Sequence, residues 1–256
     1  MICVCHTGYD NVDIGAATDH GVVVSNVLDY ATEAVAEFVF ALALDFLRKI
    51  EVADTLVHKG EFDCHYYLSN RLLAGKTLGV VGAGNIGRRV IQIARSFDMN
   101  VIATTAHPSS EREKELGTKF VPLADLLSES DIVTLHLPLT QETEHVIGAR
   151  ELDMMKPTSI LINTSRGKIV NEEALIDALS KKKIAGAALD VFEREPLPVD
   201  NPLLKLDNLV LTPHIAYLSE ETIDKCAKIC IENVEMFLKD KPQNVVNPSV
   251  LRKDQM

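Results

Sequence analysis

The stretch KTLGVVGAGNIG, residues 76–87, decides the fold that the sequence predicts. Residues 78–81 are apolar except for one glycine and predict a buried strand. A G-x-G-x-x-G turn follows at residues 82–87, and residues 88–97 place apolar side chains at the 3.6-residue period of an amphipathic helix. A strand, this turn and a helix in that order predict a dinucleotide site, whereas the bare motif often marks an ordinary glycine loop.

Each glycine of this turn is expected at its position for a different physical reason. Gly82 permits the tight turn, Gly84 lets the backbone approach a pyrophosphate, and Gly87 lets the helix pack closely on the strand. The N–H groups at the start of the helix, around Asn85 and Ile86, are then expected to face the diphosphate.

Composition and charge narrow the class of protein. The chain has 256 residues, of which 46% are hydrophobic and 25% charged, as expected for a soluble globular protein of one large or two ordinary domains. Its net charge is −11 and its longest basic run is residues 181–183, which argues against nucleic acid or an anionic membrane as a partner. We expect no signal peptide ahead of the first strand, and the most apolar run, 34–47, is too short to span a bilayer.

The five cysteines are odd in number and form no C-x-x-C motif. This pattern favours free buried thiols over a metal or redox site. We therefore expect a cytoplasmic protein without a bound metal. The cysteines are Cys3, Cys5, Cys64, Cys226 and Cys230.

The first 59 residues predict the end of one domain and the start of another. A strand at 2–5, a short helix to about residue 19 and a strand at 22–24 resemble the last part of a βαβ domain whose first strands are missing. Residues 32–59 then predict one long helix with apolar side chains nearly all round. Because one domain face cannot cover such a helix, we expect a homodimer that buries it.

From Lys76 onward, strands and helices alternate. The strands are apolar without alternation, which predicts a parallel sheet covered by helices on both faces. The fold class is therefore α/β: a Rossmann-type, doubly wound domain at 32–217, with an incomplete flavodoxin-like substrate domain at 1–31 and 218–256. The expected strands are 77–81, 100–104, 131–135, 159–163, 184–189 and 209–211, and the expected helices are 85–97, 122–128, 149–155, 171–180 and 219–239.

Polar residues follow several of these strands, and ligands in open α/β sheets bind at the carboxyl ends of strands. An arginine, several carboxylates and a histidine are thus expected on one rim, namely Arg166, Asp190, Glu193, Glu195 and His214. Taken singly, each is also compatible with a surface ion pair, a turn cap, a solvated acidic loop or an ordinary loop histidine. Their shared placement at successive strand ends favours a site.

The sequence resembles the D-isomer-specific 2-hydroxyacid dehydrogenases over nearly its whole length. The resemblance is carried by TGYDNVD, AVAEFVFALALDFLRK, GVVGAGNIG, HLPLTQET, LINTSRGKIV, AGAALDVFEREPLP and LTPHIAY. It implies a substrate-binding arginine at Arg166, a carboxylate at Glu195 that partners the histidine, and an acid–base at His214. It also implies that the main chain at Thr7 and Gly8 receives the substrate carboxylate, and Tyr217 is a further pocket candidate. Besides the glycine turn, the residues expected to contact the cofactor are Asn85, Ile86, Thr105, Leu137, Pro138, Thr143, Thr164, Ser165, Arg166, Asp190, His214 and Ala216.

These roles agree with the chemistry of a hydride transfer between NAD(P)H and a 2-oxo acid. Reduction needs a proton at the carbonyl oxygen, and a histidine, with an ordinary pKa of ~6.5, is a natural donor. Glu195 would favour the protonated His214 ring and orient it. The fork of Arg166 can hold the carboxylate and stabilise charge that develops on the carbonyl oxygen.

Two departures from the family pattern leave questions open. The acid that usually binds the ribose about 20 residues after the glycines is replaced by Thr105, and no arginine stands next to it in the sequence. We expect NAD(H), with NADP(H) as an alternative. The short N-terminal part leaves two other functions open, a non-catalytic dinucleotide-binding interaction protein and an inactive truncated paralogue. The sequence does not identify the 2-oxo acid.

Overall fold

The computed structural model describes residues 1–62 and 70–255. The chain forms two compact units, residues 1–34 with the segment that starts at Tyr217, and Val35–Ala216. Cys64 lies outside the described residues, whereas Cys3, Cys5, Cys226 and Cys230 are free thiols. The substrate and dinucleotide roles of the predicted domains stay predictions.

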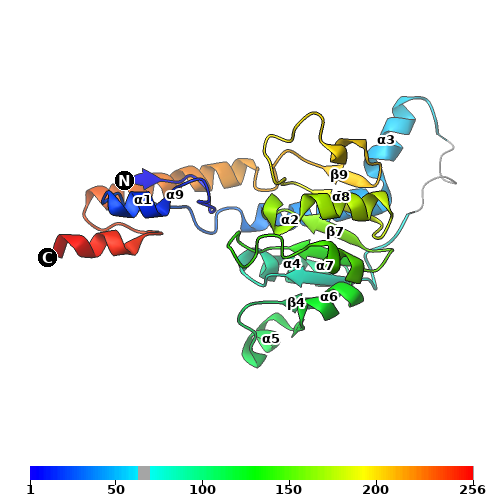
Figure 1. The fold of residues 1–256 in the computed structure, drawn as a ribbon, viewed down its shortest axis with the longest axis horizontal. Helices are drawn as coiled ribbons and strands as arrows, with labels where there is room; N and C mark the ends of the chain where they lie inside the picture. The colour runs from blue at the N-terminus through cyan, green and yellow to red at the C-terminus, as the bar shows by residue number, and fades with distance from the viewer. Residues whose placement is uncertain (63–69, 256) are drawn as a thin grey trace. The chain divides into compact units, whose positions relative to one another are not determined.

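The larger unit contains a seven-stranded sheet in the order β5-β4-β3-β6-β7-β8-β9, in which every neighbouring pair is parallel (Figure 1). The strand order reverses between β3 and β6, as in a doubly wound dinucleotide-binding fold. The predicted α/β fold class is confirmed. The strands are β3 (Thr77–Val81), β4 (Asn100–Thr104), β5 (Lys119–Phe120), β6 (Ile132–Leu135), β7 (Ile160–Asn163), β8 (Gly186–Leu189) and β9 (Leu209–Leu211).

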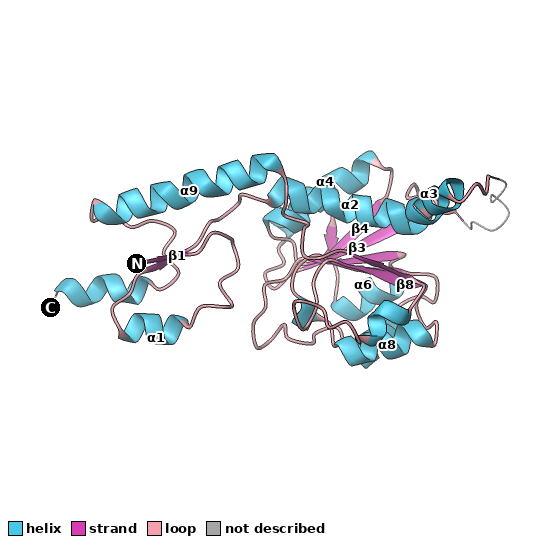
Figure 2. Cartoon of the chain, turned by 90° about the horizontal axis from the view of Figure 1, so that it is seen from above, coloured by secondary structure: helices cyan, strands magenta, loops and turns pink. Residues whose placement is uncertain are grey.

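Alternate residues of the strands contact helices on opposite faces of the sheet. Leu78 and Val80 of β3 belong to the core under α2 and α4, while Val81 belongs to the core under α6, α7 and α8. Figure 2 shows the same two layers, with α2 and α4 on one side and α6 and α8 on the other. The helices are α2 (Thr32–Arg48), α4 (Asn85–Ser96), α5 (Ser110–Leu116), α6 (Leu123–Glu129), α7 (Ala149–Met154) and α8 (Glu172–Ser180), with 3-10 turns at Gly167–Ile169 and Pro202–Lys205.

The prediction of one long helix over residues 32–59 is wrong. The helix is interrupted at Lys49, whose backbone is left-handed with a φ of 55° and a ψ of 44°. A second helix, α3 (Ile50–His58), begins after it. The Asp45 carboxylate accepts a hydrogen bond from the N–H of Glu51 at 3.0 Å across the break. This side chain supplies an acceptor where the helical ladder is interrupted, so a polar residue inside the apolar stripe ends the helix.

The expected reason for dimer formation through α2 is also wrong. Val39, Leu42 and Phe46 are buried in the core of their own unit, and only Phe38 and Leu44 among the large apolar side chains of α2 are half-buried. The helix is therefore largely covered within the chain. By contrast, no residue of α3 is buried.

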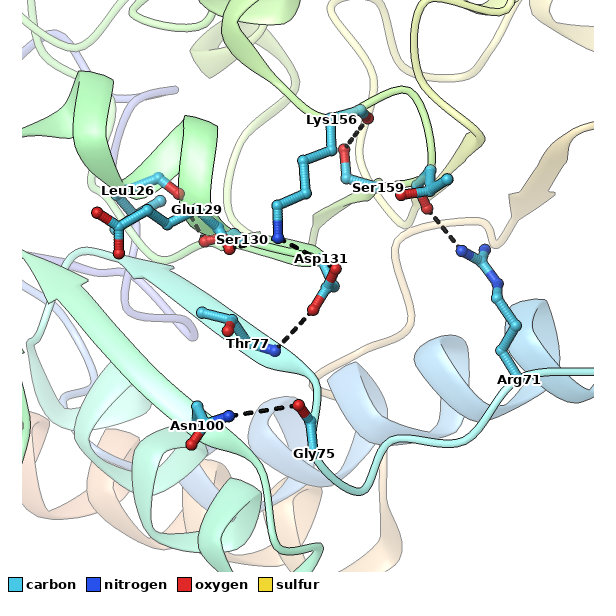
Figure 3. A network of polar contacts seen from close by, with 11 residues as sticks. Arg71, Gly75, Thr77, Asn100, Leu126, Glu129, Ser130, Asp131, Lys156 and Ser159 are labelled. Atoms are coloured by element: carbon cyan, nitrogen blue, oxygen red, sulfur yellow. Dashed lines mark hydrogen bonds and ion pairs between the residues drawn. The ribbon is translucent and has the colours of Figure 1, made fainter.

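A polar network fastens the amino ends of the strands, opposite the glycine turn (Figure 3). The Asp131 carboxylate, just before β6, accepts from the N–H of Thr77 at 2.9 Å and from Lys156 Nζ at 3.2 Å. Burial raises the pKa of the Asp131 carboxyl, but the hydrogen bonds from Thr77 and Lys156 outweigh it, so the net shift is downward. Asp131 thus joins β3 and β6 through a charge-assisted contact.

The smaller unit holds a two-stranded parallel sheet of β1 (Ile2–Cys3) and β2 (Val24–Ser25), with α1 (Ile14–Asp19), α9 (Glu220–Leu238) and a 3-10 segment at Pro248–Gln255. The Asn233 side chain of α9 donates to the Asn26 carbonyl at 2.9 Å. Several apolar side chains of this unit are exposed, Ile2, Ile223, Ile231, Val234 and Leu238.

No helix in the described part of the chain has the length and hydrophobicity needed to cross a bilayer.

Candidate active site

The candidate residues of the larger unit lie at one edge of its sheet. All the strand pairs are parallel, so the loops that follow β3, β6, β7, β8 and β9 leave from the same edge. The glycine turn follows β3, Asn163–Gly167 ends β7, Asp190–Pro196 follows β8, and Thr212–Ala216 follows β9. The structure therefore places the predicted chemistry at a common edge.

The glycine turn has the geometry that a diphosphate site requires. Gly82 has a φ of +99°, and a Cβ there would overlap the carbonyl of His136. A Cβ on Gly87 would overlap the Gly82 carbonyl, so α4 and the turn pack backbone to backbone. A Cβ on Gly84, the residue that precedes α4, meets no atom within 4 Å. The backbone of Gly84 is thus open at the helix start, where Asn85 and Ile86 follow.

The loop after β6 contains the predicted cofactor contacts Leu137, Pro138 and Thr143. The Thr143 hydroxyl donates to the Pro138 carbonyl at 2.6 Å and accepts from the N–H of Thr140 at 2.7 Å, which fixes the loop locally. The His136 ring Nε2 lies 3.0 Å from the Thr134 hydroxyl, and burial lowers the pKa of this ring to about 3. His136 is therefore neutral at physiological pH and adds no charge beside the glycine turn.

Asn163 shapes the loop that presents Arg166. Its amide donates to the Arg166 carbonyl at 2.8 Å, and its side-chain oxygen accepts from the N–H of Ser165 at 3.0 Å and from the Ser165 hydroxyl at 2.9 Å. Arg166 Nη1 donates to the Ser165 carbonyl at 2.7 Å. The Thr164 hydroxyl is buried, and no described group bonds to it. A buried hydroxyl in this position fits a ligand that supplies its hydrogen bond.

Asp190 holds the loop that carries His214. This carboxylate is fully buried and accepts from the Thr212 hydroxyl at 2.6 Å, from the N–H of Ile215 at 2.9 Å and from the N–H of Ala216 at 2.8 Å. A buried carboxylate is stable only when such donors compensate it. Asp190 therefore positions the histidine loop; its predicted cofactor contact, like that of Ala216, stays a prediction.

His214 and Glu195 form the central pair. His214 Nδ1 lies 2.7 Å from Glu195 Oε2, and Glu195 Oε1 accepts from the N–H of Phe192 at 3.0 Å. His214 itself has a φ of 56°. Since left-handed backbone is uncommon outside glycine, the surrounding loop holds this residue in an unusual conformation.

Glu193, the other predicted carboxylate, points to a different partner. Its Oε1 lies 2.8 Å from His145 Nε2 and accepts from the N–H of Glu172 at 2.9 Å. The structure thus separates the two carboxylates, with Glu195 on His214 and Glu193 on His145 and the first residue of α8. Sequence reasoning missed His145 and Glu172, because only the folded chain brings them together.

Thr105 has a partner that the sequence analysis did not find. Arg112 Nη1 donates to the Thr105 hydroxyl at 3.3 Å, although no arginine stands next to Thr105 in the sequence. Arg112 lies seven positions after Thr105 in the chain, and α5 brings its side chain back to the end of β4. The signal in the sequence that could have revealed α5 is Ser109, a residue type that often precedes a helix. In the structure the Ser109 hydroxyl caps α5 by accepting from the N–H of Arg112 at 3.2 Å.

Thr7, Gly8 and Tyr217 belong to the smaller unit. The Thr7 hydroxyl donates to the Val27 carbonyl at 2.8 Å, and the Asn26 amide donates to the Thr7 carbonyl at 2.7 Å. The Tyr217 ring meets that of Tyr30 edge-on, with centroids 6.5 Å apart. These contacts fix the local structure, and the predicted substrate contacts stay predictions.

The doubly wound sheet with its glycine turn is a dinucleotide-binding fold, and a histidine–carboxylate pair lies at the same sheet edge. Residues 40–216 match the family model of the D-isomer specific 2-hydroxyacid dehydrogenase, NAD binding domain. The chain belongs to this family of oxidoreductases.

Relatives and solved structures agree with this assignment. A glyoxylate reductase from Korarchaeum cryptofilum is 45% identical over 249 residues, which are 96% of this chain and 75% of the relative. The D-lactate dehydrogenase from Aquifex aeolicus, complexed with NAD and lactic acid, is 32% identical with a TM-score of 0.88 over 96% of this chain and 79% of that one. An acyclic imino acid reductase in complex with NADPH and D-Arg is 36% identical with a TM-score of 0.87, over 95% of this chain and 77% of that one.

Proposed function

We propose that the chain reduces a small 2-oxo acid to its D-2-hydroxy acid with a nicotinamide dinucleotide. The observation that carries the proposal is the contact of 2.7 Å between His214 Nδ1 and Glu195 Oε2 at the sheet edge that bears the glycine turn. A bound nicotinamide supplies the hydride. The protein must then supply a proton, hold the acid and stabilise the oxygen.

The proton comes from His214 in this proposal. Glu195 occupies Nδ1, so Nε2 is the ring nitrogen that delivers the proton to the carbonyl oxygen. The carboxylate stabilises the protonated ring and fixes its orientation, as in other histidine–carboxylate pairs. The pair therefore acts as a general acid in reduction and as a general base in the reverse direction.

Arg166 binds the substrate in the same proposal. Its guanidinium carries five donors in a planar fork, which suits the carboxylate and the neighbouring carbonyl oxygen of a 2-oxo acid. The positive charge would also stabilise negative charge that develops on that oxygen. Thr7, Gly8 and Tyr217 remain proposed substrate contacts, and the unit with residues 1–31 and 218–256 remains the proposed part of a substrate domain.

The relatives that are glyoxylate reductases suggest glyoxylate as the first substrate to test. We expect oxidation of NADPH or NADH with glyoxylate, and none with acetaldehyde, which has the carbonyl group but no carboxylate for Arg166. Equal rates with both compounds would contradict substrate binding through the carboxylate. If the chain binds the cofactor but oxidises it with no 2-oxo acid of a wider panel, the non-catalytic binding function is supported instead.

A homodimer through residues 32–59 also remains a proposal. The exposed apolar surface of this segment lies on α3, where Ile50 and Val57 are 55% and 54% exposed. These residues stand seven apart and share a helix face, so a second copy of the chain would cover them together.

We expect wild-type chain to sediment as a dimer and the double variant Ile50→Glu, Val57→Glu to sediment as a folded monomer. Burying two charged glutamates would cost more free energy than the formation of the interface releases. In the monomer the same glutamates are exposed to solvent and carry no such cost. A variant at Leu42 would not test this point, because Leu42 lies in the core of its own unit. A wild-type monomer at micromolar concentration would contradict the proposal.

A further inference from the structure

The end of β4 lies directly beside the glycine turn. β3 and β4 pair with Val81 opposite Thr104, and the N–H of Gly82 donates to the Thr104 carbonyl at 3.0 Å. The next residue, Thr105, stands where dinucleotide-binding folds place the acid that accepts the ribose hydroxyls. A hydroxyl at this position neither accepts as strongly as a carboxylate nor repels a phosphate.

Arg112 belongs to α5, the helix that follows β4 (Figure 1), and its side chain reaches the end of β4. Arg112 Nη1 donates to the His107 carbonyl at 2.6 Å and to the Thr105 hydroxyl at 3.3 Å, and Nη2 donates to the Ala83 carbonyl at 2.8 Å. The guanidinium carbon also lies 5.4 Å from the centre of the Phe120 ring. The cation is therefore held between the end of β4 and the glycine turn.

The described contacts of Arg112 include no carboxylate. All three hydrogen-bond acceptors are neutral, two carbonyls and a hydroxyl, and no carboxylate among the side chains that the structure describes forms an ion pair with Arg112. Neighbouring carboxylates have other partners: Glu113 accepts from the N–H of Phe120 at 2.7 Å, and Glu115 pairs with Arg88. Three hydrogen bonds also leave two of the five guanidinium donors for a ligand.

We propose that Arg112 and Thr105 form a 2′-phosphate subsite, so that this chain prefers NADP(H) to NAD(H). The proposal rests on the dinucleotide site proposed above and names its cofactor. The 2′-phosphate supplies the anion that Arg112 lacks, and a guanidinium binds phosphate through parallel N–H donors. The Thr105 hydroxyl donates a further hydrogen bond, and the absence of an acid at this position removes the repulsion that excludes NADP(H) from NAD-specific sites.

A structural alternative exists for the same contacts, in which Arg112 only fastens the glycine turn through the Ala83 carbonyl. The two interpretations predict different effects of losing Arg112 on the ratio of the Kd values for NADPH and NADH. If Arg112 only stabilises the glycine turn, its loss would weaken NADH and NADPH binding together, because both cofactors use the turn. Loss of a phosphate ligand would weaken NADPH alone.

The experiment measures Kd for NADPH and NADH from the fluorescence of the bound nicotinamide. The chain has no tryptophan, so tryptophan fluorescence does not interfere with this signal. Calorimetry with adenosine 2′,5′-bisphosphate and 5′-AMP repeats the comparison without the nicotinamide half. We expect wild type to bind NADPH more tightly. Arg112→Met, which keeps an apolar stem beside Phe120, should weaken NADPH binding by about 10- to 100-fold, as expected for a lost hydrogen bond to a charged group, and leave NADH binding unchanged.

Two further variants sharpen the result. Lys114→Met removes the same charge from the same helix and should leave both Kd values unchanged. Thr105→Asp should shift the ratio toward NADH, since the new carboxylate pairs with Arg112 and repels the phosphate. Tighter binding of NADH by wild type, or equal losses for both cofactors in Arg112→Met, would overturn the subsite alone. Failure of wild type to bind either cofactor would overturn the dinucleotide site and the subsite with it.

Discussion

Replacement of His214 by alanine is expected to lower kcat for 2-oxo acid reduction by ~10²–10⁴-fold, the usual contribution of a positioned acid–base. The ring that donates the proton is lost, while the glycine turn and the Asp190 contacts that hold the loop remain. The Kd for the cofactor should therefore change little. Steady-state rates with glyoxylate and a cofactor titration on the same preparation separate the two effects.

The control for this variant is His145→Ala, which removes another histidine that pairs with a carboxylate, 2.8 Å from Glu193. That contact joins loops and does not belong to the proposed acid–base pair. The fall in kcat for His145→Ala should therefore be much smaller than the fall for His214→Ala. Near-normal turnover in His214→Ala would contradict the mechanism. An equal fall in both variants would show that the effect is not specific to His214.

Gly84→Val is expected to abolish measurable dinucleotide binding without unfolding the chain. A Cβ at Gly84 meets no protein atom within 4 Å, and the backbone there has a φ of −76°, so we expect the free protein to tolerate valine. It would occupy the space through which a pyrophosphate reaches the helix start. Loss of two charge-assisted hydrogen bonds alone corresponds to a fall in affinity of about 100-fold or more.

The matched control is Gly148→Val, the same substitution at the residue that precedes α7. Its side chain would meet Glu151 at an ordinary contact distance, and the site is not part of the glycine turn. Both variants should show wild-type circular dichroism and thermal unfolding. Unchanged affinity for both cofactors in folded Gly84→Val would place the diphosphate elsewhere.

Elements with strong local signals could be predicted from the sequence. β3, β4 and β9 have the predicted bounds because each is an apolar run bounded by turn residues. The glycine turn is confirmed at Gly82 and Gly87, where a Cβ would overlap backbone atoms, whereas the space at Gly84 is open. The two-residue strand β5 was missed together with α5, since a strand of that length has no periodicity to detect.

Features that depend on distant contacts could not be predicted. The break at Lys49 depends on the Asp45 side chain, which the helical pattern counts only as one polar residue. The contact of Arg112 with Thr105 depends on the path of a seven-residue helix. Similarly, an acid at the end of a strand gives no sign that three donors from the next loop will enclose it, as they enclose Asp190.

The pH profile of Glu195→Gln tests the account most directly, because the amide keeps the shape of the side chain and removes its charge. Reduction requires the protonated His214 ring, so activity falls as the pH rises. Without the Glu195 charge the proton is held less strongly, and the fall in kcat/KM for reduction should move to lower pH. Glu193→Gln, which neutralises a carboxylate two residues away, should leave the profile of wild type. Superimposable profiles for wild type and Glu195→Gln would contradict the pairing.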